Sequence, residues 1–200
     1  MVRWEPNARG RLEQAALELY IERGFEQTTV AEIAKRAGLT ERTFFRYFAD
    51  KREVLFGGSA ALQELLTREV ADAPAALAPL DAVAHGLKAL SALFEQRGEF
   101  PQQRQTVIAA NADLQERELI KLASLAAATA EALRLRGVKE PAASLTAEAG
   151  IAVFKISFAR WVDHANKRAF AALIQESLDE LKAVTGGSLP GGASGERSDV

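Results

Sequence analysis

Residues 29–51 carry two short helical patterns joined by a tight turn, and this arrangement constrains the fold more than any other part of the chain. The segment reads TVAEIAKRAGLTERTFFRYFADK, with the turn at residues 37–40. Gly38 permits the turn, and Thr29 and Glu32 have the spacing of a capping box at the start of the first helix. Two helices joined in this way form a helix-turn-helix, whose second helix fits the major groove of DNA. The segment therefore predicts a DNA-binding module.

The composition fits an all-α protein and argues against several functional classes. Apolar residues make up 48% of the 200 residues, and they recur with helical spacing, which predicts about nine helices. Cysteine is absent and the two histidines lack companion ligands, so we expect no metal and no cofactor. No nucleophile–base grouping is apparent, so we expect no enzymatic activity. No apolar run approaches the roughly 20 residues that span a bilayer, and the N-terminus lacks a secretory signal, so we expect a cytoplasmic protein without membrane contact.

The chain is expected to divide into three parts. Residues 1–56 form the helix-turn-helix domain, a three-helix unit whose reading motif lies at about 30–49. Residues 57–185 form a larger helical domain, and the Gly/Ser-rich residues 186–200 form a disordered tail.

Between the first two parts, Asp50 is expected to cap a helix that continues to about Val70, with a weak point at Gly57-Gly58. Asp113 and Glu116 have the spacing of a second capping box. Further helices are expected at about residues 8–23, 80–97, 101–110, 114–136, 142–166 and 168–184.

Net charge by itself does not favour DNA. The whole chain carries −2, and residues 1–56 carry ten Lys/Arg and nine Asp/Glu, which leaves them at +1. Affinity for DNA depends instead on whether cations gather on one face. Six cations are close in sequence, although such a run is also typical of an ordinary solvated surface: Lys35, Arg36, Arg42, Arg46, Lys51 and Arg52.

The start of the second motif helix carries the candidate base contacts. Thr40 is the expected N-cap, Arg42 can pair with a guanine, and Thr43 and Phe44 can touch a thymine methyl. Tyr47 can donate its hydroxyl to a phosphate. Each of these residues also has a structural interpretation, because threonines cap helices, tyrosines close cores and exposed arginines are often merely solvated. Two further aromatic residues are expected to pack against the neighbouring helices: Phe45 and Phe48.

Residues 8–56 resemble the DNA-binding domain of the tetracycline-repressor (TetR) family of bacterial transcriptional regulators. The resemblance is carried by YIERGF at 20–25, TTVAEIA at 28–34, AGL at 37–39, TFFRYF at 43–48 and DKREVL at 50–55.

The resemblance implies which residues touch DNA. It implies phosphate contacts from one of the two threonines that open the first motif helix, Thr28 or Thr29, from Tyr47 and from Lys51. It also implies base or backbone contacts from the start of the second motif helix. Members often carry tyrosine where this chain has Phe45, which lacks a hydroxyl, so Arg46 and Tyr47 are the expected substitutes. The predicted DNA-binding set is Thr28, Thr29, Thr40, Arg42, Thr43, Phe44, Arg46, Tyr47 and Lys51.

The last predicted helix carries a stripe of apolar and small residues at helical spacing. Such a stripe packs either against a second copy of the chain or against the chain's own core, and periodicity alone does not choose between them. The resemblance implies a dimer formed through the last two helices. The predicted interface is therefore Phe170, Leu173, Ile174, Ser177, Leu178 and Leu181.

The resemblance also implies a small-molecule cavity in residues 57–185, and a mostly apolar cavity with a few polar groups suits an organic effector. Aromatic residues at helical spacing are equally typical of a core, and Arg104 can either hold an anionic ligand or be solvated. The candidate ligand-binding residues are Phe94, Phe100, Arg104, Phe154, Phe158 and Trp161.

The expected function is that of a homodimeric, ligand-responsive transcriptional regulator, which in this family is most often a repressor. Such a dimer binds a near-palindromic double-stranded DNA operator and is released by a small-molecule effector. The alternative is a small-molecule-binding or interaction protein that has lost sequence-specific DNA binding, which the charge balance and Phe45 leave open.

Overall fold

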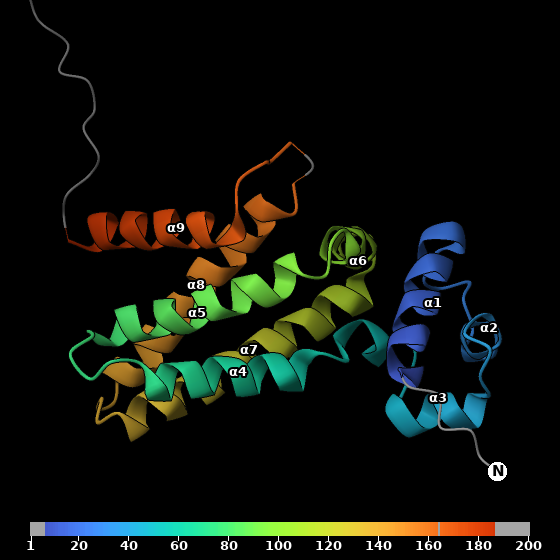
Figure 1. Cartoon of the computed structure of the whole chain (residues 1–200), viewed down its shortest axis with the longest axis horizontal. Helices are drawn as coiled ribbons and strands as arrows, with labels where there is room; N and C mark the ends of the chain where they lie inside the picture. Colours follow the sequence, from blue (N-terminus) through green and yellow to red (C-terminus); the bar gives the residue numbers. More distant parts are fainter. Residues whose placement is uncertain (1–6, 164, 187–200) are drawn as a thin grey trace, which may run out of the picture.

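The computed structural model of the protein describes residues 7–163 and 165–186. All regular structure in these residues is helical, with nine α-helices and one 3-10 helix, which confirms the predicted all-α class. Three helices, α1 (Ala8–Arg23), α2 (Val30–Arg36) and α3 (Glu41–Tyr47), form a group at one end of the molecule, and α4–α9 form an elongated bundle beside it (Figure 1).

Local signals set the ends of the first three helices as predicted. Thr29 and Glu32 form the capping box of α2: the Glu32 amide donates to Thr29 Oγ1 at 3.3 Å and the Thr29 amide donates to Glu32 Oε2 at 2.9 Å. Thr40 Oγ1 caps α3 by accepting from the amide of Thr43 at 3.2 Å. Gly38 turns the chain between α2 and α3 with a φ of 66°, a left-handed conformation that costs glycine little.

The chain does not continue from Asp50 as one long helix. Asp50 Oδ1 accepts from the amides of Arg52 and Glu53 at 2.8 and 3.0 Å, and the turn that it holds leads only into a short 3-10 helix, η1 (Glu53–Phe56). The regular helix α4 (Ser59–Asp72) begins after Gly57-Gly58. The weak point predicted at the glycine pair is therefore a full interruption of the helix.

The C-terminal bundle has a single apolar core. Its other helices are α5 (Pro79–Glu95), α6 (Phe100–Ala109), α7 (Ala112–Leu135), α8 (Ala142–Trp161) and α9 (Phe170–Thr185). α5 packs against α4, α8 and α9, while α7 packs against α4 and α8. Gly150 allows α8 to approach α5 closely, because a Cβ there would lie 2.4 Å from Val83 Cγ1.

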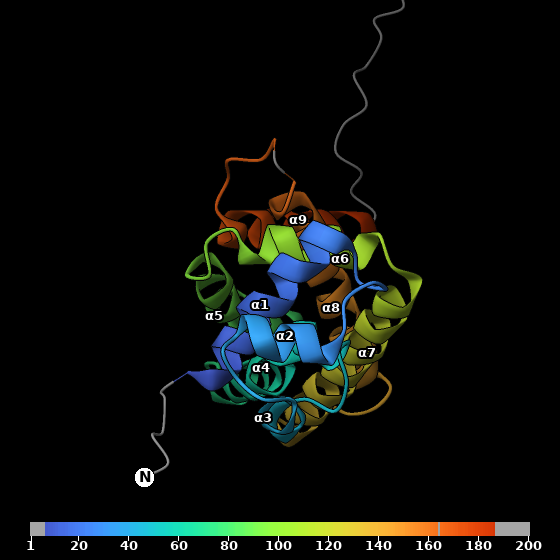
Figure 2. The same ribbon diagram turned by 90° about the vertical axis from the view of Figure 1, so that its right-hand side faces the viewer.

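A second core lies under the helix-turn-helix and is shared with the bundle. Leu12, Ile33, Phe44 and other residues of the N-terminal helices pack together with side chains of α6 and of the start of α7, namely Val107, Ile108 and Leu114. Figures 1 and 2 show α6 close to α1. The N-terminal group therefore rests on α6 and α7 rather than hanging from α4 alone.

Three predictions about helix ends were wrong or cannot be compared. α7 begins at Ala112 with Asn111 as N-cap and without a side-chain cap hydrogen bond, because the helix starts too early for Asp113 and Glu116 to form a capping box. α8 ends at Trp161, five residues before the predicted end at 166. Apart from Gly186, the tail predicted over 186–200 lies outside the described residues.

The stripe on α9 faces inward. Phe170, Leu173, Ile174, Ser177 and Leu178 are buried within the chain itself, and Leu181 packs against the same core. The hydroxyl of Ser177 meets that of Ser157 on α8 at 2.9 Å. The prediction that this stripe forms the dimer interface was wrong, because α5 and α8 already cover it.

α8 is an exception to the prediction that no segment is apolar and long enough to span a bilayer. Ala142–Trp161 is long and apolar enough to cross a bilayer by length and composition alone. Its inner side packs against α5, α7 and α9, as the inner side of a core helix in a globular bundle does.

Candidate DNA-binding surface and ligand cavity

α3 is anchored through aromatic side chains on one face. Phe44 is fully buried and Phe48 is nearly so, and both belong to the core of the N-terminal helices. Their ring centroids lie 5.6 Å apart. Residues four apart lie on the same side of a helix, so this pair fixes the rotation of α3 about its own axis.

The opposite face of α3 is open to solvent. Glu41, Arg42, Phe45 and Arg46 are exposed, and Phe45 leaves 56% of its surface uncovered. Figure 2 views the molecule from this end, with the three N-terminal helices nearest the reader. The face therefore presents two guanidinium groups around an aromatic ring.

The sequence-based assignment of Phe44 and Phe45 was reversed. Phe44 was expected to meet a thymine methyl and Phe45 to pack inside, whereas the structure buries Phe44 and exposes Phe45. The error arises because both 44/48 and 45/48 are helical spacings, so the run of aromatic residues does not reveal which pair faces inward. Phe45 therefore takes the exposed place that was assigned to Phe44.

The cations around the motif differ in what they already bind. Within the described residues, Arg42 and Lys35 have no ion pair or hydrogen bond, and Arg46 only donates to the adjacent hydroxyl of Tyr47 at 3.3 Å. Arg36, in contrast, donates to both carboxylate oxygens of Glu22, at 2.9 and 2.8 Å, and thereby lowers the pKa of that carboxyl. Lys35, Arg42 and Arg46 are thus the cations best placed to meet phosphate.

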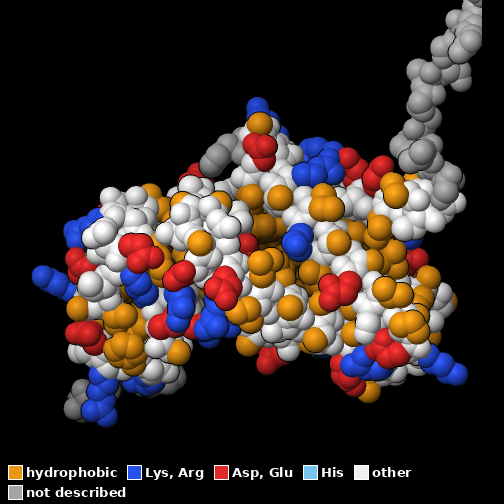
Figure 3. Space-filling view, turned by 180° about the vertical axis from the view of Figure 1, so that it is seen from behind, with side chains coloured by type: hydrophobic (Ala, Val, Ile, Leu, Met, Phe, Trp, Pro, Cys, Tyr) orange, Lys and Arg blue, Asp and Glu red, His pale blue; other side chains and the backbone are white. Residues whose placement is uncertain are grey.

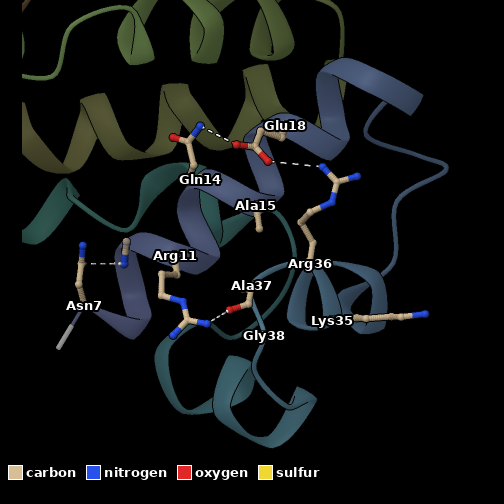
Figure 4. A pocket seen from close by; sticks show the side chains of 10 residues that line it. Asn7, Arg11, Gln14, Ala15, Glu18, Lys35, Arg36, Ala37 and Gly38 are labelled. Carbon is tan, nitrogen blue, oxygen red and sulfur yellow. Dashed lines mark hydrogen bonds and ion pairs between the residues drawn. The ribbon is translucent and has the colours of Figure 1, made fainter. Parts of the chain in front are cut away.

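A shallow cleft lies between α1 and the turn of the motif (Figure 4). Arg11 reaches across it and donates to the carbonyl of Ala37, and a Cβ on Gly38 would lie 2.7 Å from the same guanidinium. Lys35 extends away from the cleft, and Arg36 turns toward Glu18. The polar groups of this cleft bind one another, so we assign it the structural role of fastening the turn to α1.

The threonines at the start of α2 differ in exposure. Thr28 is buried, and its hydroxyl donates to the carbonyl of Gly24 at 2.9 Å, with the carbonyl of Leu19 at 3.4 Å. The predicted phosphate contact of the Thr28 hydroxyl was therefore wrong. Thr29 is exposed, but its side chain is engaged in the capping box.

Lys51 binds the protein rather than pointing into solvent. Its ammonium group donates to three backbone carbonyls of the loop between α1 and α2: Phe25 at 2.9 Å, Glu26 at 3.2 Å and Thr28 at 3.2 Å. It also lies 4.4 Å from the centre of the Phe25 ring. An ammonium group has three N–H donors, and all three are engaged. The arrangement contradicts a phosphate contact and indicates that Lys51 positions the start of α2.

A cavity of about 660 Å³ lies between α4, α5, α6, α7 and α8. Five of the six candidate ligand residues line it: Phe94, Phe100, Arg104, Phe154 and Phe158. Trp161 does not, because its indole is stacked on the ring of Phe170 at 5.0 Å inside the core. Apolar side chains gather around a hollow near the middle of the face seen in Figure 3.

Arg104 joins this cavity to the linker that follows the helix-turn-helix. Its Nε donates to the carbonyl of Leu55 in η1 at 2.7 Å, and a terminal nitrogen pairs with Glu118 at 3.2 Å. Its guanidinium also lies 4.8 Å from the centre of the Phe56 ring. Burial lowers the pKa of Arg104, and the neighbouring carboxylate of Glu118 opposes this shift.

α7 holds the same linker from the other side. Glu53 of η1 pairs with Arg117, and with Lys121 at 3.0 Å. Lys121 and Glu118 both line the cavity. A ligand that moves Lys121 therefore acts directly on the segment between the DNA-binding helices and α4, and one that moves Glu118 acts on it through Arg104.

Sequence reasoning missed most polar residues of the cavity wall, among them Arg97, Gln105, Glu118, Lys121 and Lys155. Polar positions on amphipathic helices are ordinarily the solvent side, and nothing local marks those that face a cavity. Across the described ranges, no group of three or more acidic, histidine or cysteine side chains could hold a metal ion.

The sequence profile of the bacterial regulatory proteins of the tetR family matches residues 13–56. This segment contains α2, α3 and the capping and packing residues described above. Residues 13–56 thus form a DNA-binding domain of the TetR family.

Individual TetR-family proteins resemble different parts of the chain. The transcriptional regulator TcmR of Streptomyces glaucescens is 38% identical over 82 residues, which cover 41% of this chain and 36% of TcmR. The match thus spans about a third of that curated relative.

Two solved structures match nearly the whole length. FadR of Thermus thermophilus, a TetR-family repressor solved with lauroyl-CoA, is 25% identical with a TM-score of 0.52, covering 95% of this chain and 100% of that one. A TetR-family regulator from Syntrophomonas wolfei is 19% identical with a TM-score of 0.66, covering 92% and 97%. The second likeness concerns the fold alone.

Proposed function

We propose that this protein is a ligand-responsive transcriptional repressor that binds a near-palindromic DNA operator as a homodimer and leaves it when a small molecule fills the cavity. The observation that carries the proposal is the solvent face of α3, which exposes Arg42, Phe45 and Arg46. In the described residues neither of the two arginines has a carboxylate partner. Exposed cations and an aromatic ring on a helix-turn-helix suit phosphate and base edges.

The face divides into base and phosphate contacts. Arg42 lies in the first turn of α3, where side chains of the second motif helix reach base edges, so we assign it a guanine contact. Phe45 lies one turn further and can touch a thymine methyl. Arg46, Tyr47 and Lys35 are assigned to phosphates, because they flank the reading face and have no acidic partner in the described residues.

A different face must form the dimer, since the α9 stripe is buried. The outer side of α8 carries small and apolar residues at spacings of three and four: Leu145, Ala149, Ala152, Ile156 and Ala159. Leu145 is 66% exposed and Ile156 is 57% exposed. We infer that this α8 stripe packs against its copy in a second chain, which would place two α3 helices at half-sites about 10 bp or more apart.

A charge on the α8 stripe tests the dimer. Ile156→Glu should convert the protein to a monomer in light scattering and weaken operator binding, because a carboxylate would be buried at the contact. Leu135→Glu is the matched control, because Leu135 is 78% exposed on α7 and lies outside the stripe. Equal behaviour of the two variants would reject the α8 interface.

Release follows from the contacts that Arg104, Arg117 and Lys121 make with η1. A ligand lowers DNA affinity only if it binds the released conformation more tightly than the DNA-bound one. We propose that filling the cavity moves Arg104 or Lys121, frees η1, and changes the spacing of the two α3 helices.

The test of DNA binding is fluorescence anisotropy with labelled fragments from the flanks of the protein's own coding region. The wild type should bind one fragment in preference to random DNA, and Arg42→Ala should lose that preference by about 1–3 kcal/mol. Arg68→Ala is the control, because Arg68 is exposed on α4 and pairs only with Glu69 within the described residues. No binding to any fragment at low salt would reject the proposal and favour a small-molecule-binding protein that does not read DNA.

A further inference from the structure

The cavity wall carries far more positive than negative charge. Among its lining residues are Arg97, Arg104, Lys121 and Lys155, and only one carboxylate, Glu118. The partners of Arg97 and Lys121 are Glu13 and Glu53, neither of which lines the cavity. Glu118 is already engaged, since it accepts from Arg104 at 3.2 Å and from Gln105 at 3.5 Å. A cationic ligand would thus find no free carboxylate on the wall, while Lys155 remains as an uncompensated like charge.

Lys155 is the cavity cation with no partner. The residues that the structure describes offer its ammonium group no ion pair and no hydrogen bond. It lies on α8 next to Phe154 and three residues from Phe158, whose rings stack at 5.7 Å and line the same cavity. A positive charge beside an apolar aromatic wall suits the acidic group of an otherwise apolar molecule.

Gln105 adds a hydrogen-bond acceptor. Its Nε2 donates to Glu118, and this contact fixes which end of the amide faces the carboxylate. The opposite atom, Oε1, is buried without a hydrogen-bond partner. Buried acceptors are rarely left unpaired, so Gln105 gains a hydrogen bond if its amide turns Oε1 toward an O–H or N–H donor in the cavity.

We infer that the cavity binds an amphipathic organic acid: an aromatic or acyl body lies against the phenylalanine rings, its anionic group pairs with Lys155, and a hydroxyl or N–H donates to Gln105 Oε1. The inference deepens the proposed function, since it names the chemical class of the effector, but binding itself does not require that the protein regulate transcription. Arg104 lies on the same wall, so the acid also competes with the Leu55 carbonyl for the guanidinium that holds η1.

Two fluorescent probes that differ only by a sulfonate group test the ligand class. The first, 8-anilino-1-naphthalenesulfonate, has aromatic rings, an N–H donor and a sulfonate, and the second, N-phenyl-1-naphthylamine, lacks the sulfonate. In titrations of the full chain, Lys155→Gln should weaken sulfonate binding about three- to fivefold and Lys155→Glu about tenfold. Both variants should leave the uncharged probe within about twofold of the wild type.

The matched control is Lys139→Gln, because Lys139 is exposed and lies outside the cavity wall. It should change neither probe. Because Lys155 has no partner in the described residues, its variants should fold as the wild type does, and far-ultraviolet circular dichroism checks this. Equal loss of both probes in Lys155→Glu, or sulfonate binding that is indifferent to position 155, would overturn the inference.

Adding the sulfonate probe to the complex with labelled DNA separates this inference from the proposed function. Lys155-dependent binding of the sulfonate with release of the DNA supports both. Lys155-dependent binding without any effect on the DNA complex supports the ligand class and contradicts its role as an effector. DNA binding that is intact while the sulfonate ignores Lys155 contradicts the ligand class alone.

Discussion

Lys51 offers the sharpest test of how the helix-turn-helix is held together. We expect Lys51→Met to destabilise the protein, because the methionine keeps the apolar stem against Phe25 but removes three hydrogen bonds to backbone carbonyls. Hydrogen bonds that involve a charged group contribute about 1.5–3 kcal/mol each when buried. The three carbonyls lie near the surface, where water replaces part of what is lost, so we expect a total of about 2 kcal/mol.

Urea denaturation followed by circular dichroism measures this change, and the free energy of unfolding should fall by that amount. For a chain of this length the melting temperature should drop by about 4–8 °C. Arg42→Gln is the control, because Arg42 binds nothing in the described residues, and its stability should stay within about 0.5 kcal/mol of the wild type.

The salt dependence of DNA binding decides between a structural and a phosphate-binding Lys51. If its ammonium group stays on the loop, Lys51→Met lowers affinity without changing the slope of log K against log salt. If the group binds a phosphate, that slope becomes shallower by about one and the urea midpoint does not move. The second pair of results would refute the structural role.

Four further substitutions test the register of α3 and the linker. Phe44→Ala should lower the free energy of unfolding by about 3–5 kcal/mol in urea denaturation, because the ring is fully buried. Phe45→Ala should lower it by less than about 0.5 kcal/mol, and similar losses in the two variants would place both rings inside. Phe45→Tyr should tighten specific and random DNA alike in anisotropy titrations, since a new hydroxyl at this exposed place can reach a phosphate; a gain on one sequence alone would point to a base contact instead. Gly58→Ala should stabilise the chain by about 0.4–1 kcal/mol, because the φ of −80° suits alanine and the added Cβ would lie 3.7 Å from the Arg97 guanidinium. If Gly58 is a hinge, this variant should also need more effector to release DNA. Gly57→Ala does not test the hinge cleanly, because the added carbon would lie 2.8 Å from Phe48.

The parts of the fold that sequence predicted well are those set by neighbouring residues. The capping box of Thr29 and Glu32, the cap at Thr40 and the turn at Gly38 each depend on a few consecutive positions, and all three occur as predicted. The family resemblance rests on the same kind of short pattern. Local chemistry of this sort can be read without knowing what lies across the molecule.

The parts that sequence predicted poorly depend on partners that are distant in the chain. The period of the α9 stripe shows that one side of the helix is covered. The same period would result whether that side packs against a second chain or against α8 of the same chain. Lys51 and Lys155 look alike in sequence, yet one binds three carbonyls and the other lines a cavity with no partner in the described residues. Burial and charge pairing belong to the tertiary structure, and a single sequence contains them only indirectly.

The shared core under the helix-turn-helix predicts that a residue of the larger bundle controls the rigidity of the DNA-binding helices. Ile108 of α6 is fully buried in the core of α1–α3, and Leu133 of α7 is fully buried in the core of the bundle. Replacing either by alanine should cost about 2–5 kcal/mol, because each leaves a cavity of similar size.

The two variants should differ in where the structure loosens. In hydrogen-exchange measurements, Ile108→Ala should speed amide exchange throughout α1–α3 and weaken DNA binding, although Ile108 lies outside the motif. Leu133→Ala should speed exchange in the bundle and leave α1–α3 protected. If Ile108→Ala left the exchange of α1–α3 unchanged, the N-terminal helices would be held by their own contacts alone. The route from the cavity to DNA would then run through η1 and not through the shared core.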